Sequence, residues 1–232
     1  MKKGILWIFG DSYGTFHRPG DELKDWHWMW NLADKLNHKN FYNICEDGVA
    51  NEWIYFQLMQ NSDKITEDDT VIFITTQFNR QWFFPGNDGV GNIMIPNLSN
   101  YVKKEEAVAI DFYLKYLTDN PQNHIRFQWL LYALNFLKNN KIKLFIVPGF
   151  ENEGFDFGAK ITGSLFDVCY KEAKGKTFDN WAKWIKSQGG KDPRESHISK
   201  CNHPVLAEKL YQTIVNDNDL DFSTGFKQDF LI

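Results

Sequence analysis

The feature that most constrains the fold is a set of short apolar runs, each ended abruptly by turn or polar residues. The runs Gly4–Phe9, Thr70–Thr75 and Lys143–Val147 are apolar on almost every successive residue, and a weaker run covers Phe41–Ile44. Strands that are covered on both faces need apolar side chains on successive residues and not only on alternate ones. The runs therefore predict buried, parallel β-strands.

Amphipathic helical patterns lie between these runs. Trp26, Met29, Trp30, Ala33 and Leu36 recur at spacings of three and four residues, which is the spacing of one helix face. Alternation of strands and helices favours a doubly wound, three-layer α/β/α sandwich with a mainly parallel sheet. Helices are expected over five ranges: Asp25–Leu36, Asn51–Met59, Ile125–Leu137, Phe178–Ile185 and His203–Val215.

The length of 232 residues suits one domain with a substantial core. Two stretches, Gln81–Asn123 and Gly149–Thr177, carry no regular strand or helix pattern and are long for loops in a compact domain. Loops of this length often cover a functional site. We expect a single domain over residues 1–232 with these two long insertions.

Charge and cysteine content narrow the function classes. The formal net charge of −4 argues against nucleic acid or an anionic membrane as the main partner. The three cysteines, Cys45, Cys169 and Cys201, form no CxxC pair and favour neither a disulfide framework nor a zinc site. The first apolar run is too short for a signal peptide, and no run has the length of a transmembrane helix. These features predict a cytoplasmic protein that uses no metal.

The first apolar run ends in FGDSYGTF, which spans Phe9 to Phe16. Ligands bind open parallel sheets at the carboxyl ends of the strands, where this segment lies. Gly10 allows a tight turn, and Asp11 can hydrogen-bond within it. Ser12 would need a general base and N–H donors for an oxyanion to act as a nucleophile. Taken alone, Gly-Asp-Ser is equally the composition of a simple turn.

Two further segments accompany it in order: ICEDGVANEWI after the second strand, and KDPRESHISKCNHPVLAEKLYQ before the last helix. Together the three segments resemble the blocks of the SGNH (GDSL-like) hydrolase superfamily, over nearly the whole chain. The resemblance implies a flavodoxin-like α/β/α domain and a serine hydrolase that needs no cofactor. The Asn- and Lys-rich composition and the divergent blocks resemble those of phage-encoded members, for which release by cell lysis would be an alternative to a cytoplasmic location.

The resemblance implies that Ser12 is the nucleophile and that its backbone N–H forms an oxyanion hole with the N–H of Gly48. The third block of the superfamily, Gly-x-Asn-Asp, is replaced here by VIFITTQFNR. Gln77 or Asn79 could supply the missing side-chain amide, and Thr76 could donate a hydroxyl instead.

The last block implies that His197 is the catalytic base and that His203 is a structural residue at the start of the closing helix. The aspartate that the superfamily carries three residues before the base is absent. Asp192 or Glu195 could orient the imidazole, or a backbone carbonyl could complete a Ser-His dyad. Asp192 is favoured slightly, because Pro193 fixes a turn that could fold its carboxylate back.

Two residues after the third strand are candidates for substrate binding. Arg80 could bind an anionic group of the substrate, or it could be a solvated surface residue. Trp82, in the segment QWFFPG, could form an apolar wall of a cleft or anchor the long loop inside the fold.

We therefore predict a serine esterase or deacylase. It would hydrolyse a carbohydrate O-acyl ester, or another small acyl ester, through an acyl-enzyme on Ser12. One alternative is a catalytically weak binding module of the same fold that holds a glycan or a protein partner. Another is an acyltransferase that uses the same acyl-enzyme. The expected partner is a small-molecule or glycan ester, and the sequence indicates no oligomeric state.

Overall fold

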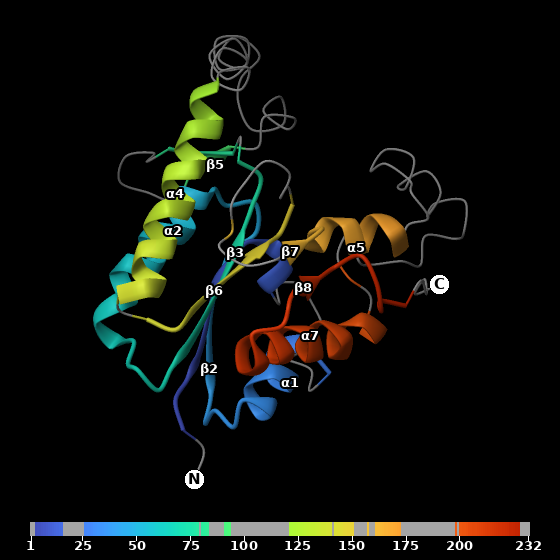
Figure 1. Cartoon of the computed structure of the whole chain (residues 1–232). Coiled ribbons are helices and arrows are strands. Elements are labelled where there is room, and N and C mark those ends of the chain that lie inside the picture. The colour runs from blue at the N-terminus through green and yellow to red at the C-terminus, as the bar shows by residue number, and fades with distance from the viewer. Residues whose placement is uncertain are drawn as a thin grey trace.

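A four-stranded, all-parallel sheet forms the centre of the protein (Figure 1). The computed structural model describes residues 3–15, 26–78, 80–83, 91–93, 121–140, 142–150, 157, 161–172, 198 and 200–227. The sheet has the strand order β2-β1-β3-β6. Its strands are β1 (Leu6–Gly10), β2 (Phe41–Cys45), β3 (Thr70–Thr75) and β6 (Leu144–Pro148). The parallel α/β prediction is confirmed.

The strand register brings the carboxyl ends of the strands to one edge of the sheet. Gly10 at the end of β1 pairs with Cys45 at the end of β2. Thr75 at the end of β3 pairs with Pro148 at the end of β6. Since β1 lies between β2 and β3, the turns that follow these three strands are neighbours.

Helices flank both faces of the sheet. Leu6 and Ile8 of β1 belong to a core cluster with residues of α1 (Trp28–Lys35) and α7 (His203–Asn216). The alternate residues Trp7 and Phe9 belong to a second cluster, with residues of α2 (Asn51–Asn61) and α4 (Pro121–Asn140). Both faces of β1 are buried, which is why this run is apolar on successive residues.

The two predicted insertions contain regular structure of their own. The first contains β4 (Gln81–Phe83) and β5 (Gly91–Ile93), and the second contains β7 (Ile161–Thr162) and α5 (Leu165–Glu172). Smaller elements elsewhere in the described chain are η1 (Ser12–Gly14), η2 (Ser62–Lys64), η4 (Lys200–Asn202) and β8 (Leu220–Asp221). Helix α5 was not predicted; it buries Leu165, Val168 and Cys169, a pattern of only one helical turn. The predicted helix Phe178–Ile185 lies outside the described residues.

No helix in the described ranges has both the length and the apolarity needed to cross a membrane. The longest, α4, has 20 residues, but polar and charged residues such as Gln122, Arg126 and Lys138 interrupt its apolar ones. About 20 predominantly apolar residues in a row are needed to span a bilayer.

Candidate functional site

Ser12 lies on a one-turn 3-10 helix, η1, directly after the central strand β1. Its neighbours Asp11 and Tyr13 are buried, with 0% and 6% of their surfaces exposed, whereas Ser12 is half-buried. The Asp11 carboxylate accepts a hydrogen bond from the Tyr13 N–H at 3.2 Å, and the Asp11 carbonyl accepts one from the Gly14 N–H at 2.9 Å. The buried cap residue Asp11 and the buried Tyr13 therefore hold the turn that presents Ser12.

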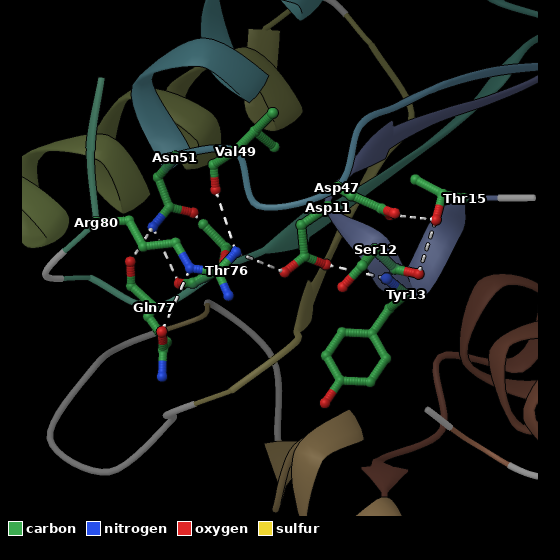
Figure 2. Close-up of polar contacts among 10 residues, drawn as sticks. All are labelled: Asp11, Ser12, Tyr13, Thr15, Asp47, Val49, Asn51, Thr76, Gln77 and Arg80. Carbon is green, nitrogen blue, oxygen red and sulfur yellow. Dashed lines mark hydrogen bonds and ion pairs between the residues drawn. The ribbon is translucent and has the colours of Figure 1, made fainter. Parts of the chain in front are cut away.

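A buried ion pair lies beneath this turn. The Arg80 guanidinium contacts the Asp11 carboxylate at 3.4 Å, and only 6% of the arginine side chain is exposed (Figure 2). The same group donates hydrogen bonds to the Val49 carbonyl and to the Gln77 side-chain oxygen, both at 3.3 Å. It also lies 5.1 Å from the centre of the Phe150 ring. Arg80 thus links the turns after β1, β2 and β3.

This position differs from both expectations for Arg80. A solvated surface arginine would be exposed, and an arginine that binds a substrate anion would direct its donors outward. Here the side chain is buried and engaged with Asp11, Val49 and Gln77. We therefore do not assign Arg80 to substrate binding. It is a cross-link inside the site, and the sequence analysis did not predict the Asp11–Arg80 pair.

Asn51 provides a second link between neighbouring turns. It is the first residue of α2 and is 4% exposed. Its side-chain oxygen accepts a hydrogen bond from the Thr76 N–H at 2.9 Å, and its amide donates to the Thr76 carbonyl at 3.0 Å and the Gln77 carbonyl at 3.3 Å. These bonds pin the chain after β3 to the start of α2. Within the described residues the buried Thr76 hydroxyl has no hydrogen-bond partner.

Several N–H groups at this edge of the sheet remain unused among the described residues. Neither the Ser12 N–H nor the Gly48 N–H donates a hydrogen bond there. Gly48 has φ +73°, a conformation that favours glycine and turns the backbone sharply after β2. The Gln77 side-chain oxygen is fixed by Arg80, while its amide nitrogen donates to no described residue. The sequence analysis named these three donors as candidates for an oxyanion hole, and that assignment stays a prediction.

Tyr13, the residue after Ser12, stays protonated at neutral pH. Burial raises the pKa of Tyr13 well above its ordinary value of 10.0, and the neighbouring Cys169 and Asp11 add to this rise. Its ring contacts Phe150 edge to face, with the ring centres 5.4 Å apart. The Tyr13 carbonyl accepts a hydrogen bond from the Trp28 indole N–H at 3.4 Å. Tyr13 is thus a neutral packing residue that supports the Ser12 turn, and it is no candidate for a general base.

The predicted base, His197, lies outside the described residues. So do both candidates for its orienting acid, Asp192 and Glu195, and the oxyanion-hole candidate Asn79. Ile198 is described and is buried, in the core cluster that also contains Tyr13. His203 occupies the structural position expected of it, since it is 7% exposed at the start of α7. Its Nδ1 accepts a hydrogen bond from the Trp28 N–H at 3.3 Å.

Trp82 lies in β4 and is half-buried. Its ring contacts Phe56 of α2, with ring centres 5.3 Å apart, and it packs against the second core cluster. This position agrees with the alternative in which Trp82 anchors the loop to the domain. Among the described residues, no group of three or more His, Cys, Asp or Glu side chains could hold a metal ion.

Comparisons with known proteins add no family to this site, since no protein-family model and no curated protein matches the chain.

Proposed function

We propose that the protein is a serine hydrolase of the SGNH type that acts on an ester through an acyl-enzyme on Ser12. The observation that carries the proposal is the Ser12 turn: a half-buried serine lies between two buried residues at the carboxyl end of the central strand. A substrate carbonyl could approach Ser12 here while its neighbours hold the turn in place.

The fold supports the proposal at a coarser level. Helix pairs on both faces of a parallel sheet with the order β2-β1-β3-β6 fit a three-layer, flavodoxin-like α/β/α sandwich, the fold of the SGNH superfamily. In such sheets ligands bind outside the carboxyl ends of the strands, which is where Ser12, Gly48 and Gln77 lie. The fold alone does not specify an activity.

The proposed chemistry assigns a role to each group. The Ser12 hydroxyl attacks the ester carbonyl, and the N–H groups of Ser12 and Gly48, with the Gln77 amide, hold the negative charge on the oxygen. His197 takes the serine proton and passes it to the leaving alcohol, and then activates water against the acyl-enzyme. An acceptor alcohol in place of water would give acyl transfer. The substrate class that we propose is a carbohydrate O-acyl ester or another small acyl ester.

Covalent labelling with a fluorophosphonate probe tests the nucleophile. We expect the wild-type chain to be labelled and to hydrolyse p-nitrophenyl acetate, and Ser12→Ala to lose both properties. His197→Ala should slow both by about 100- to 10,000-fold, the usual contribution of a general base. A Ser62→Ala variant is the matched control, because this serine lies on η2 and should not affect labelling.

Two outcomes would change the proposal. Absence of Ser12-dependent labelling together with absence of ester turnover would favour a binding module of the same fold. Labelling that survives Ser12→Ala would place the nucleophile elsewhere. If the proposal holds, the values of kcat/KM for Asp192→Asn and Glu195→Gln identify the acid that orients His197, and equal, small effects indicate a Ser-His dyad.

A further inference from the structure

The outer face of α4 carries a row of large apolar side chains. Ile125, Trp129, Tyr132 and Phe136 are 53%, 66%, 65% and 55% exposed. Their spacings of four, three and four residues place them on one narrow stripe of the helix, as in the seam of a coiled coil. The rings of Trp129 and Tyr132 contact each other edge to face, with centres 5.9 Å apart. Single exposed apolar residues are ordinary, but a continuous row of them marks an interaction surface.

The opposite face of α4 already anchors the helix to the domain. Phe127, Leu131, Leu134 and Leu137 are buried in the second core cluster, against α2 and the sheet. The helix is therefore apolar on two faces, and the elements that the structure describes bury only one of them. A helix that is apolar on two faces is typical of one that is covered on both sides.

We propose that this stripe, Ile125 to Phe136, is a self-association surface and that its partner is the same stripe of a second copy of this chain, running antiparallel. The spacing of four, three and four residues reads the same in both directions. Around a two-fold axis, Trp129 therefore faces Tyr132 of the second copy, and Ile125 faces its Phe136. Such an isologous contact satisfies both copies at once and forms a closed dimer.

Charge on the helix favours this partner and this orientation. The described helix contains no acidic residue, and its two cations lie off the stripe. Arg126 is ion-paired with Glu52 of α2, and Lys138 lies 5.9 Å from the centre of the Phe145 ring. The stripe is flanked by the uncharged residues Gln128, Ala133 and Asn135. Antiparallel pairing keeps the Arg126 side chains of the two copies apart and aligns opposite ends of the helix dipoles.

The available area approaches that of a stable dimer. Taking about 200 Å² for a large side chain, the exposed parts of the four stripe residues amount to about 500 Å² per copy. Phe56 and Met59, which are 37% and 41% exposed, lie on the face of α2 that also carries Glu52, the residue that pairs with Arg126. With these two residues the surface amounts to about 650 Å² per copy, at the lower end of the roughly 600–1,000 Å² that each partner contributes to a standard interface.

Sedimentation of the full chain tests the dimer. We expect a mass of about twice 27.3 kDa for the wild type at about 100 µM. Trp129→Glu should sediment as a folded monomer, because it places a charge at the centre of the seam. The matched control is Val215→Glu, which adds the same charge at a 51% exposed apolar position of α7, on the other side of the sheet, and should leave the dimer intact.

Cross-linking tests the antiparallel arrangement. The background is Cys201→Ser, which leaves only the buried Cys45 and Cys169 as native cysteines. Ile125→Cys and Phe136→Cys are made in separate chains. A mixture of the two should form an intermolecular disulfide, because Ile125 faces Phe136 of the second copy, whereas either variant alone should cross-link only weakly.

Three results would overturn the proposal. The first is a wild-type chain that sediments as a monomer. A monomer that co-sediments with phosphatidylcholine vesicles would assign the stripe to a lipid surface and would overturn the dimer equally. The second is a Trp129→Glu variant that remains a dimer. The third is cross-linking of either cysteine variant alone as efficient as that of the mixture.

Discussion

At the scale of single residues, the contact between Asp11 and Arg80 matters most to the candidate site, because both side chains are almost fully buried. A buried charge is tolerated only when a partner and hydrogen bonds compensate it. Here the compensation joins three turns, since Arg80 also bonds to Val49 and Gln77. Arg80 therefore holds in place the turns that carry the candidate residues Ser12, Gly48 and Gln77.

Removing Arg80 should therefore be costly. Arg80→Ala leaves the Asp11 carboxylate buried without its cation, and we expect the free energy of unfolding to fall by about 3–5 kcal/mol in urea denaturation. Arg80→Lys keeps the charge but not the fork of donors, and should restore part of the stability while Ser12 labelling stays slow.

The matched control for this prediction is Arg126→Ala. Its ion pair with Glu52 joins two side chains that are 42% and 39% exposed, so its loss should cost about 0–1 kcal/mol. Equal losses in the two alanine variants would show that burial of the Asp11–Arg80 pair does not contribute as argued.

Gly48 offers a second test at the residue scale. Gly48→Ala forces a side chain onto a backbone with φ +73° and should cost about 1–2 kcal/mol. Because the shift would move the unused Gly48 N–H, fluorophosphonate labelling of Ser12 should also slow by 10-fold or more. Gly225→Ala, at φ +79° beside Lys209, carries the same strain away from Ser12 and should lose stability without slower labelling.

At the scale of elements, the junction of α1 and α7 depends on two histidines. His27 precedes α1, and its Nδ1 accepts a hydrogen bond from the Met29 N–H at 3.5 Å. The centre of its ring lies 4.4 Å from that of His203, which begins α7. Trp26 packs edge to face against His203, with ring centres 4.9 Å apart. Two helix starts from opposite ends of the sequence thus share one aromatic contact.

This junction predicts loss of stability in acid. Burial lowers the pKa of His27 from its ordinary value of 6.5 to about 3, so the unfolded chain binds a proton in this range that the folded chain does not. The contribution of neutral His27 to the free energy of unfolding is present above pH 6.5 and is lost as the pH falls from 6.5 towards 3. Between pH 6.5 and 5 the loss of folding free energy from this residue amounts to about 1.6 kcal/mol.

Denaturation as a function of pH measures this effect. His27→Asn keeps an acceptor for the start of α1 but cannot titrate, and its stability should change less between pH 6.5 and 5 than that of the wild type. His124→Gln, at an exposed position of α4, should retain the wild-type dependence. A wild-type slope in His27→Asn would assign the acid sensitivity to other groups.

At the scale of the whole molecule, the sheet separates two core clusters, and the helices on its faces differ in what they leave exposed. The α4 stripe concentrates four large apolar residues on one side of the molecule. The candidate serine lies at the carboxyl edge of the sheet, on η1 after β1, and is not part of the α4 stripe. Dimerisation through α4 would therefore use a surface that does not include Ser12.

A dimer also changes how stability depends on concentration. Because only the folded chain can present the α4 stripe, Tm should rise with protein concentration for the wild type and for Val215→Glu. It should be constant for Trp129→Glu over the same range. Scanning calorimetry between about 5 and 500 µM measures this, and a constant wild-type Tm would contradict the dimer.

Local patterns in the sequence predict the strands of the sheet and its main helices. Successive apolar residues predict the strands within one or two residues of their observed ends, because a buried parallel strand needs apolar side chains on both faces. A helix such as Asn51–Asn61 is also predicted from its own segment, because the three- and four-residue spacing of its apolar residues is a local feature of the sequence. The place of Ser12 at the end of the first strand follows from the same pattern.

The contacts that hold the candidate site together follow from the folded chain and not from any local pattern. Asp11 and Arg80 are 69 positions apart, and Asn51 and Thr76 are 25 apart, so no local pattern reveals these contacts. Arg80 is the only charged residue in the described stretch from Thr70 to Phe83, which is the one sign in the sequence that it is special. Whether such a charge faces water or a buried carboxylate depends on which turns the sheet brings together, and only the folded chain determines that.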